Sequence, residues 1–142
     1  MNNRYLFKAI DTNSVWRTGL LIALKGDRCT IEESDGSKWA CDAKTLCQCT
    51  GLKDKNGKLI WENDILHNGN YFVVKWNESC SRFDIVLNKF CNIPIGKWEP
   101  MICDWKTNDF KEYRKAVDYE VIGNVFDNPK LLGIEVDEEI ER

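Results

Sequence analysis

The plainest candidates for chemistry are Glu62 and Asp64, two carboxylates separated by one residue. On a single strand their side chains would point to the same face, and paired carboxylates can perform acid–base chemistry or hold a divalent cation. The alternative is that Glu62-Asn63-Asp64 is a polar turn leading into a strand. No phosphate-binding loop, serine-hydrolase elbow or metalloprotease spacing accompanies the pair. We therefore predict no catalytic residues and keep an enzyme using Glu62 and Asp64 only as an alternative.

Seven cysteines and one histidine, His67, are the remaining candidates for metal or nucleophile chemistry. Structural zinc sites usually show two close pairs of ligands, whereas here only Cys47 and Cys49 are close in sequence. A Cys–His nucleophile is equally unspecified, because any of the seven thiols could be the partner of His67. We predict no metal and no cofactor, and we interpret the cysteines as small buried thiols.

The charge of the chain is uneven. The 142 residues, with 20 basic and 23 acidic side chains, have a net charge of −3. Residues 133–142 hold five acidic side chains and one basic one, so this end carries −4 and the rest of the chain +1. We expect 133–142 to be a solvated acidic tail. A body this close to neutral excludes a strongly basic nucleic-acid-binding protein.

The beginning of the chain has no apolar leader, and no run of residues is long and apolar enough for a membrane-spanning helix. We therefore expect a cytoplasmic protein with no membrane partner. In a reducing compartment the cysteines would be free thiols.

Short apolar alternation bounded by turn residues predicts β-strands along most of the chain. Residues 4–41 have the pattern of a small antiparallel meander, with the longest alternation at Trp16–Leu24. Asp42 is expected to cap one helical turn that ends at Gly51. Asn56-Gly57 is a type I′ hairpin signal.

Further along the chain, Tyr71–Trp76 and Arg82–Leu87 are expected to form a hairpin of two strands. Tyr119–Phe126 is the expected final strand, and Asn128 with Pro129 predicts one helical turn at Pro129–Leu132. Three further expectations are a loop, a strand and a short helix, at Asn92–Gly96, Met101–Trp105 and Thr107–Ala116.

These patterns predict a fold that is mainly β with minor α. We expect one domain in which an N-terminal antiparallel meander, residues 1–50, packs with a small SH3-like β-barrel, residues 51–132. The acidic tail at 133–142 would complete the domain.

Two long stretches, Cys49–Ile65 and Tyr119–Leu132, resemble the YopX family of bacteriophage and prophage proteins. The segments Arg4–Ala9 and Val15–Gly19 are similar to the beginning of that family's pattern, so the resemblance covers almost the whole chain. The chain departs from the pattern at two positions. Cys49 stands where the family usually has an aromatic residue, and Asn63 stands where it often has glycine.

The resemblance implies a single YopX-like domain over residues 1–142, a phage or prophage origin, the cytosol of a bacterial host and a homo-oligomer. It implies no activity, and it supplies no catalytic residue. We therefore predict a non-enzymatic accessory protein that acts as an oligomeric binding module. One form of this function is counter-defence, by binding a host protein or sequestering a nucleotide signal.

The motif residues not explained by turns and core give the candidate binding residues: Trp61, Tyr71, Lys53, Lys55, Glu62 and Asp64. Surplus aromatic residues suit protein hot spots and also stack on nucleobases. Nucleic-acid binding by a small barrel is the alternative, with phosphate contacts from a lysine stripe. That stripe would comprise Lys53, Lys55, Lys58 and Lys75.

Overall fold

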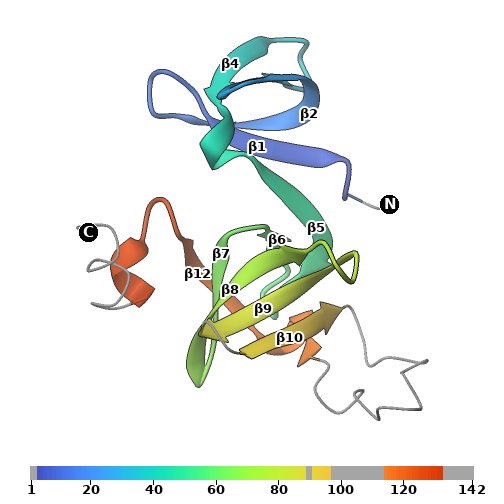
Figure 1. The fold of residues 1–142 in the computed structure, drawn as a ribbon, viewed down its shortest axis with the longest axis vertical. Coiled ribbons are helices and arrows are strands. Elements are labelled where there is room, and N and C mark those ends of the chain that lie inside the picture. The colour runs from blue at the N-terminus through green and yellow to red at the C-terminus, as the bar shows by residue number, and fades with distance from the viewer. Residues whose placement is uncertain (1–2, 89–90, 97–113, 133–142) are drawn as a thin grey trace. The chain divides into compact units, whose positions relative to one another are not determined.

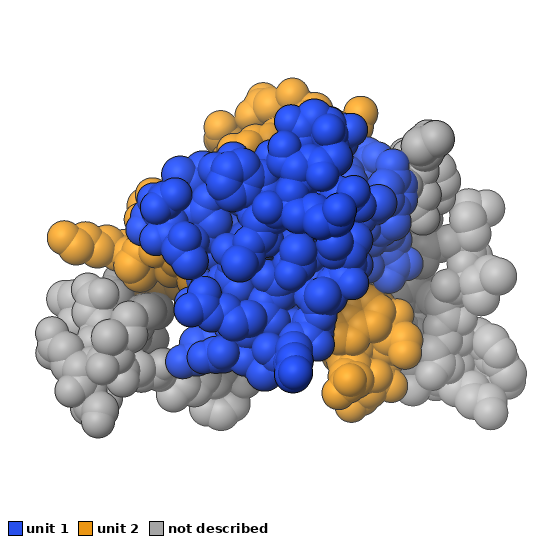
Figure 2. Space-filling model, turned by 90° about the horizontal axis from the view of Figure 1, so that it is seen from above, with its two compact units in different colours: residues 1–51 blue, residues 52–142 orange. Residues whose placement is uncertain are grey.

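The structure, a computed structural model, describes residues 3–88, 91–96 and 114–132. The chain divides into two compact units, residues 1–51 and residues 52–142, which are coloured separately in Figure 2. We refer to them as unit 1 and unit 2 and describe each by itself.

Unit 1 is built on one antiparallel sheet in the order β4-β3-β2-β1-β5. Its strands are β1 (Leu6–Ile10), β2 (Trp16–Lys25), β3 (Arg28–Glu32), β4 (Lys38–Asp42) and β5 (Cys47–Lys53). The sheet curls until a bridge between Asp11 and Cys41 joins the end of β1 to β4, and the curl is visible in Figure 1. The chain then continues along β5 into unit 2.

The core of unit 1 is small and contains two of the cysteines. Its fully buried residues are Ala9, Cys29, Ile31 and Cys41, with Phe7, Leu21, Trp39, Ala43 and Leu46 packed against them. Gly19, in the middle of β2, is buried because its backbone lies against that of β3.

The helical turn predicted after Asp42 is confirmed as η1 (Ala43–Thr45), and the Asp42 side chain accepts a hydrogen bond from the Lys44 amide. Its predicted end at Gly51 is wrong, because β5 already begins at Cys47. The Thr45 hydroxyl accepts from the Ile10 amide at 2.8 Å, which ties this turn to β1.

The main sheet of unit 2 has the order β11-β10-β9-β8-β7-β12. Its strands are β7 (Asp64–Asn68), β8 (Asn70–Asn77), β9 (Arg82–Asn88), β10 (Cys91–Gly96), β11 (Arg114–Lys115) and β12 (Glu120–Asn124). All neighbours pair antiparallel except β10 and β11, which are parallel. β6 (Leu59–Trp61) pairs with β5, and short 3-10 turns follow as η3 (Ala116–Asp118) and η4 (Pro129–Leu132).

One face of this sheet carries the larger hydrophobic core. Its buried residues are Ile60, Leu66, Phe72, Val74, Phe83, Ile85, Ile95, Ala116, Tyr119 and Val121. Phe72 and Tyr119 meet edge to face, with ring centroids 5.4 Å apart, which is a favourable aromatic arrangement.

The mainly β class is confirmed, as are the hairpin of β8 with β9 and the helical turn at η4. The Asn92–Gly96 loop is wrong: these residues belong to β10, which pairs with β9. The strand Met101–Trp105 lies outside the described residues, as does most of the helix Thr107–Ala116. The described end of that helix is instead β11 and the first residue of η3. No helix in the described part of the chain is long and apolar enough to cross a membrane.

The type I′ turn predicted at Asn56-Gly57 is also wrong. Gly57 has φ 81°, but Asn56 does not have the positive φ that a type I′ turn requires. The Asp54 amide bonds the Lys58 carbonyl and the Gly57 amide bonds the Asp54 carbonyl, so three residues form the connection. Asp54 imposes this geometry through its side chain, which accepts from the amides of Asn56 and Lys58.

Candidate functional site

The segment predicted to hold paired carboxylates is a tight turn between β6 and β7. Glu62 and Asn63 form the turn, Asn63 with φ 72°, and Asp64 is the first residue of β7. The premise that Glu62 and Asp64 share one strand is therefore wrong. Asp64 is buried and accepts from the Trp61 amide at 2.8 Å, so its carboxylate stabilises the turn itself.

Asn63 connects this turn to β8 and to the segment after β12. Its amide donates to the Val74 carbonyl in β8, and its carbonyl accepts from the Val125 amide, which follows β12. Its side-chain oxygen accepts from Lys75 Nζ at 2.7 Å. Asparagine tolerates the left-handed backbone that the turn requires. This departure from the family pattern therefore adds a side-chain contact that glycine lacks.

Two of the predicted binding residues, Tyr71 and Lys55, lie along one row of unit 2. Glu120 in β12 is directly opposite His67 in β7, and His67 is directly opposite Tyr71 in β8, so all three side chains share a face. The rings of His67 and Tyr71 are 5.0 Å apart. Lys55 Nζ lies 3.9 Å from Glu120 Oε1. Sequence reasoning did not connect His67 and Glu120 with this surface, because strand register decides it.

The lysines of the predicted stripe are engaged differently. Lys55 approaches Glu120 and Lys75 bonds Asn63, as described above. Lys53, at the end of β5, and Lys58, before β6, are exposed. Two of the four ammonium groups therefore already have acceptors within unit 2.

In unit 2, the carboxylate of Asp54 accepts three backbone hydrogen bonds. It is buried, and Oδ2 accepts from the Val121 amide at 2.9 Å, while Oδ1 serves the turn. Burial by itself raises the pKa of Asp54, but the amides of Val121, Lys58 and Asn56 outweigh it and lower the pKa below its usual value. Asp54 thus connects the hairpin at Asn56–Lys58 to β12.

In unit 1, Asp11 is the counterpart of Asp54. Its oxygens accept from Arg17 Nε at 2.8 Å and from the amides of Asn13 and Val15. The Arg17 hydrogen bond, followed by the Val15 amide, lowers the pKa of Asp11. The Arg17 guanidinium lies 3.4 Å from the centroid of the Trp39 ring, and Trp39 Nε1 donates to Glu33. Sequence patterns gave no signal for this network, because it joins residues of β2 and β4 to residues that follow β1 and β3.

These two aspartates predict how stability depends on pH. A carboxylate whose folded pKa is lowered stabilises the native state above its unfolded pKa of about 3.9 and loses that contribution as the pH falls. The free energy of unfolding should therefore be flat from about pH 7 to about pH 5 and fall below about pH 4. Urea unfolding at several pH values measures this. In Asp54→Asn the acid decline should be shallower; an equally steep decline would exclude Asp54 as a source.

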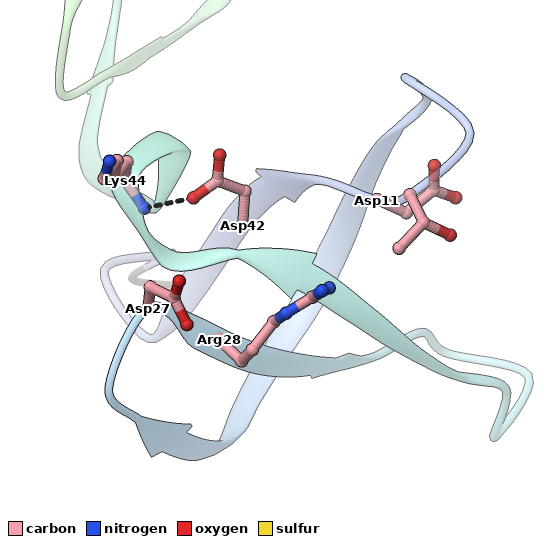
Figure 3. A pocket seen from close by; sticks show the side chains of 6 residues that line it. Asp11, Asp27, Arg28, Asp42 and Lys44 are labelled. Atoms are coloured by element: carbon pink, nitrogen blue, oxygen red, sulfur yellow. Dashed lines mark hydrogen bonds between the residues drawn. The ribbon is translucent and has the colours of Figure 1, made fainter.

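A polar pocket of about 300 Å³ opens at one end of the unit 1 sheet, lined by Asp11, Asp27, Arg28, Asp42 and Lys44 among others. Asp11 lies apart from Asp27 and Asp42, and the Lys44 amide donates to Asp42 (Figure 3). Within the described residues no three His, Cys, Asp or Glu side chains are grouped so that they could hold a metal ion.

Five cysteines are free thiols in the structure: Cys29, Cys41, Cys47 and Cys49, which are buried, and Cys80, which is exposed. Burial, with the neighbouring Cys29 as a smaller cause, raises the pKa of Cys41 to about 11. Burial also raises the pKa of Cys29. Because the thiolate is the reactive form, a raised pKa makes these thiols unreactive at neutral pH. Their role is to pack in the core of unit 1.

Brief treatment of the native protein with N-ethylmaleimide at about pH 8 should therefore modify Cys80 and spare Cys29, Cys41, Cys47 and Cys49. Peptide mass mapping reports each site separately. The same treatment in urea is the control, in which all of these thiols should react. Modification of Cys41 as fast as Cys80 in the native protein would contradict the assignment.

Large apolar side chains remain exposed along β2, the strand that contains the longest predicted alternation. Leu20, Ile22 and Leu24 are 44%, 43% and 59% exposed. β1 pairs with β2 only as far as Leu20, and among the described strands Leu21–Lys25 pair on one side alone, with β3. This half of β2 therefore presents both apolar side chains and an unpaired strand edge.

The YopX protein family matches residues 10–133 of the chain, and the protein belongs to this family. Among solved structures it is similar to the crystal structure of protein EF1440 from Enterococcus faecalis, with 23% sequence identity and a TM-score of 0.46. That similarity covers 89% of this chain and 96% of the other. A comparison with curated proteins found no match.

The structure accounts for the second family motif in physical terms. Asn128 Oδ1 accepts from the Asn124 amide, and a Cβ on Gly123 would lie 2.5 Å from that oxygen. Asn124 in turn accepts from the amides of Phe126 and Asp127. These residues build the turn after β12, so this part of the motif serves the fold.

Proposed function

We propose that this YopX-family protein is a non-enzymatic phage or prophage accessory protein that works as an oligomeric binding module. The observation that carries the proposal is the exposed half of β2, where Ile22 and Leu24 flank a strand edge with which no described strand pairs. An open strand edge with exposed apolar residues is a template for pairing with another chain. Two copies related by a two-fold axis would pair the same segment with itself.

The buried carboxylates support a binding role over a catalytic one. Asp11, Asp54 and Asp64 all accept hydrogen bonds from backbone amides of the turns that they hold. A general acid or base must instead reach a substrate. In the cytosol of an infected cell, the assembly would act on a host protein or a nucleotide signal.

Multi-angle light scattering tests the assembly. The wild-type protein should have a mass that is a multiple of its 16.5 kDa chain, because pairing would bury Ile22 and Leu24. The double variant Ile22→Ser/Leu24→Ser should shift toward the monomer. Val117→Ser, which alters a side chain 46% exposed elsewhere, is the matched control and should leave the mass unchanged. A wild-type monomer at all concentrations would overturn the proposal.

A further inference from the structure

A groove of about 750 Å³ lies on unit 1, between the beginning of β1, the middle of β2 and the turn that joins β3 to β4. Its volume is in the range of ordinary ligand and peptide sites. The groove is separate from the polar pocket and from the Ile22–Leu24 half of β2, since its lining on β2 ends at Leu20.

The apolar part of the groove is left open to water. Tyr5 is 51% exposed and Leu20 is 44% exposed, and Leu6, directly opposite Leu20, completes this part of the lining. Gly19 also lines the groove and has no side chain; a Cβ at this position would collide with the Glu32 carbonyl. The result is a concave surface where an apolar side chain of a partner could replace water.

The charged part of the groove is acidic. Glu32, Glu33 and Asp35 line it, and no lysine or arginine is among its described lining residues. Glu33 Oε1 accepts a hydrogen bond from Trp39 Nε1 at 2.8 Å and forms an ion pair with Arg17 Nη1 at 3.8 Å. Asp35 accepts from the Ser37 amide at 2.9 Å, and this bond lowers the pKa of Asp35. Glu32, opposite Lys38 in the sheet, is half-buried.

From this juxtaposition we infer that the groove binds an extended segment of a partner protein in which an apolar residue is flanked by lysine or arginine. The apolar side chain seats between Tyr5 and Leu20, and the basic side chains pair with Glu32 and Asp35. The acidic lining disfavours nucleic acid at this surface, because phosphate binding requires basic side chains. The inference rests on the proposed function, since it names the partner class of the binding module.

Selection from a random dodecapeptide phage-display library on the intact protein tests the groove. The enriched peptides should carry an apolar anchor next to lysine or arginine. A fluorescein-labelled copy of the best peptide is then titrated by fluorescence anisotropy. The double variant Glu32→Gln/Asp35→Asn, which keeps an acceptor for the Ser37 amide, should weaken binding by roughly tenfold or more. Leu20→Ser should weaken it as well.

The matched control is Asp27→Asn/Asp118→Asn, which removes two exposed charges outside the groove and should leave the affinity unchanged. Binding should also weaken as salt rises from about 50 mM to about 500 mM, because the rim charges are screened. Peptides without basic residues, or affinity unaltered in both groove variants, would overturn the groove assignment. Light scattering measures the proposed oligomer independently of peptide binding. A failure of the groove assignment can therefore be distinguished from a failure of the proposed function.

Discussion

Gly19→Ala should destabilise unit 1 by about 3 kcal/mol, because the added methyl group meets backbone and not a side chain that could move aside. A Cβ at this position would collide with the Glu32 carbonyl oxygen and lie 2.8 Å from its carbonyl carbon. Glu32 is held in register by Leu20 on one side and Lys38 on the other. The collision can therefore be relieved only if β2 and β3 move apart.

Hydrogen-exchange mass spectrometry measures this effect locally. In Gly19→Ala, peptides from β1, β2 and β3 should lose protection by roughly a hundredfold or more, which is about 3 kcal/mol. Thr18→Ala is the matched control: it alters the exposed neighbouring residue and should change protection little. Unaltered protection of the β2–β3 pair in Gly19→Ala would mean that the two strands are not as close as described.

Asp54→Ala should destabilise unit 2 by about 3 kcal/mol or more. It removes one buried carboxylate that accepts from three amides, those of Asn56, Lys58 and Val121. The Val121 amide is then left without its acceptor in a buried environment, which costs more than the loss of an exposed hydrogen bond. The hairpin before β6 and the beginning of β12 should loosen together.

Urea unfolding followed by tryptophan fluorescence reports the size of the effect, and hydrogen exchange reports its place. Asp118→Ala is the control, since this aspartate is exposed, belongs to the same unit and follows Ala116 in η3. Equal stability of Asp54→Ala and Asp118→Ala would show that the hydrogen bonds of Asp54 contribute little. Loss of protection confined to residues near Asp54 and to β12 would support the tie between them.

The strands of this protein follow from local pattern. Alternation placed β2 and β8, and the cap chemistry of Asp42 placed η1, because these features depend on neighbours in the chain. Two of the errors arose from contacts that the local pattern does not contain. Asn56-Gly57 did not form the predicted turn because the side chain of Asp54 selects another, and Asn92–Gly96 is a strand because β9 offers it a partner.

The candidate surfaces were less accessible to sequence reasoning. Tyr71 was selected for its type, but its neighbours His67 and Glu120 are set by the register of three strands. The alternation at Trp16–Leu24 predicted that Leu20, Ile22 and Leu24 share one face. That prediction is wrong, because a β-bulge between Leu21 and Ala23 places Leu20, opposite Glu32, and Leu24, opposite Cys29, on different faces. Sequence periodicity does not show where a bulge interrupts a strand, and it does not show whether anything covers the side chains of that strand.

The pairing of β12 with β7 has a consequence for how the protein is made. Asp54 and Val121 are 67 residues apart in the chain. β7 and its partner strand β12 are also far apart in the sequence. Unit 1, in contrast, closes within residues 1–51. During translation unit 1 has all its strands early, while β7 leaves the ribosome with one edge unpaired until β12 has been synthesised. That interval is when the nascent protein is most exposed to aggregation and to chaperones.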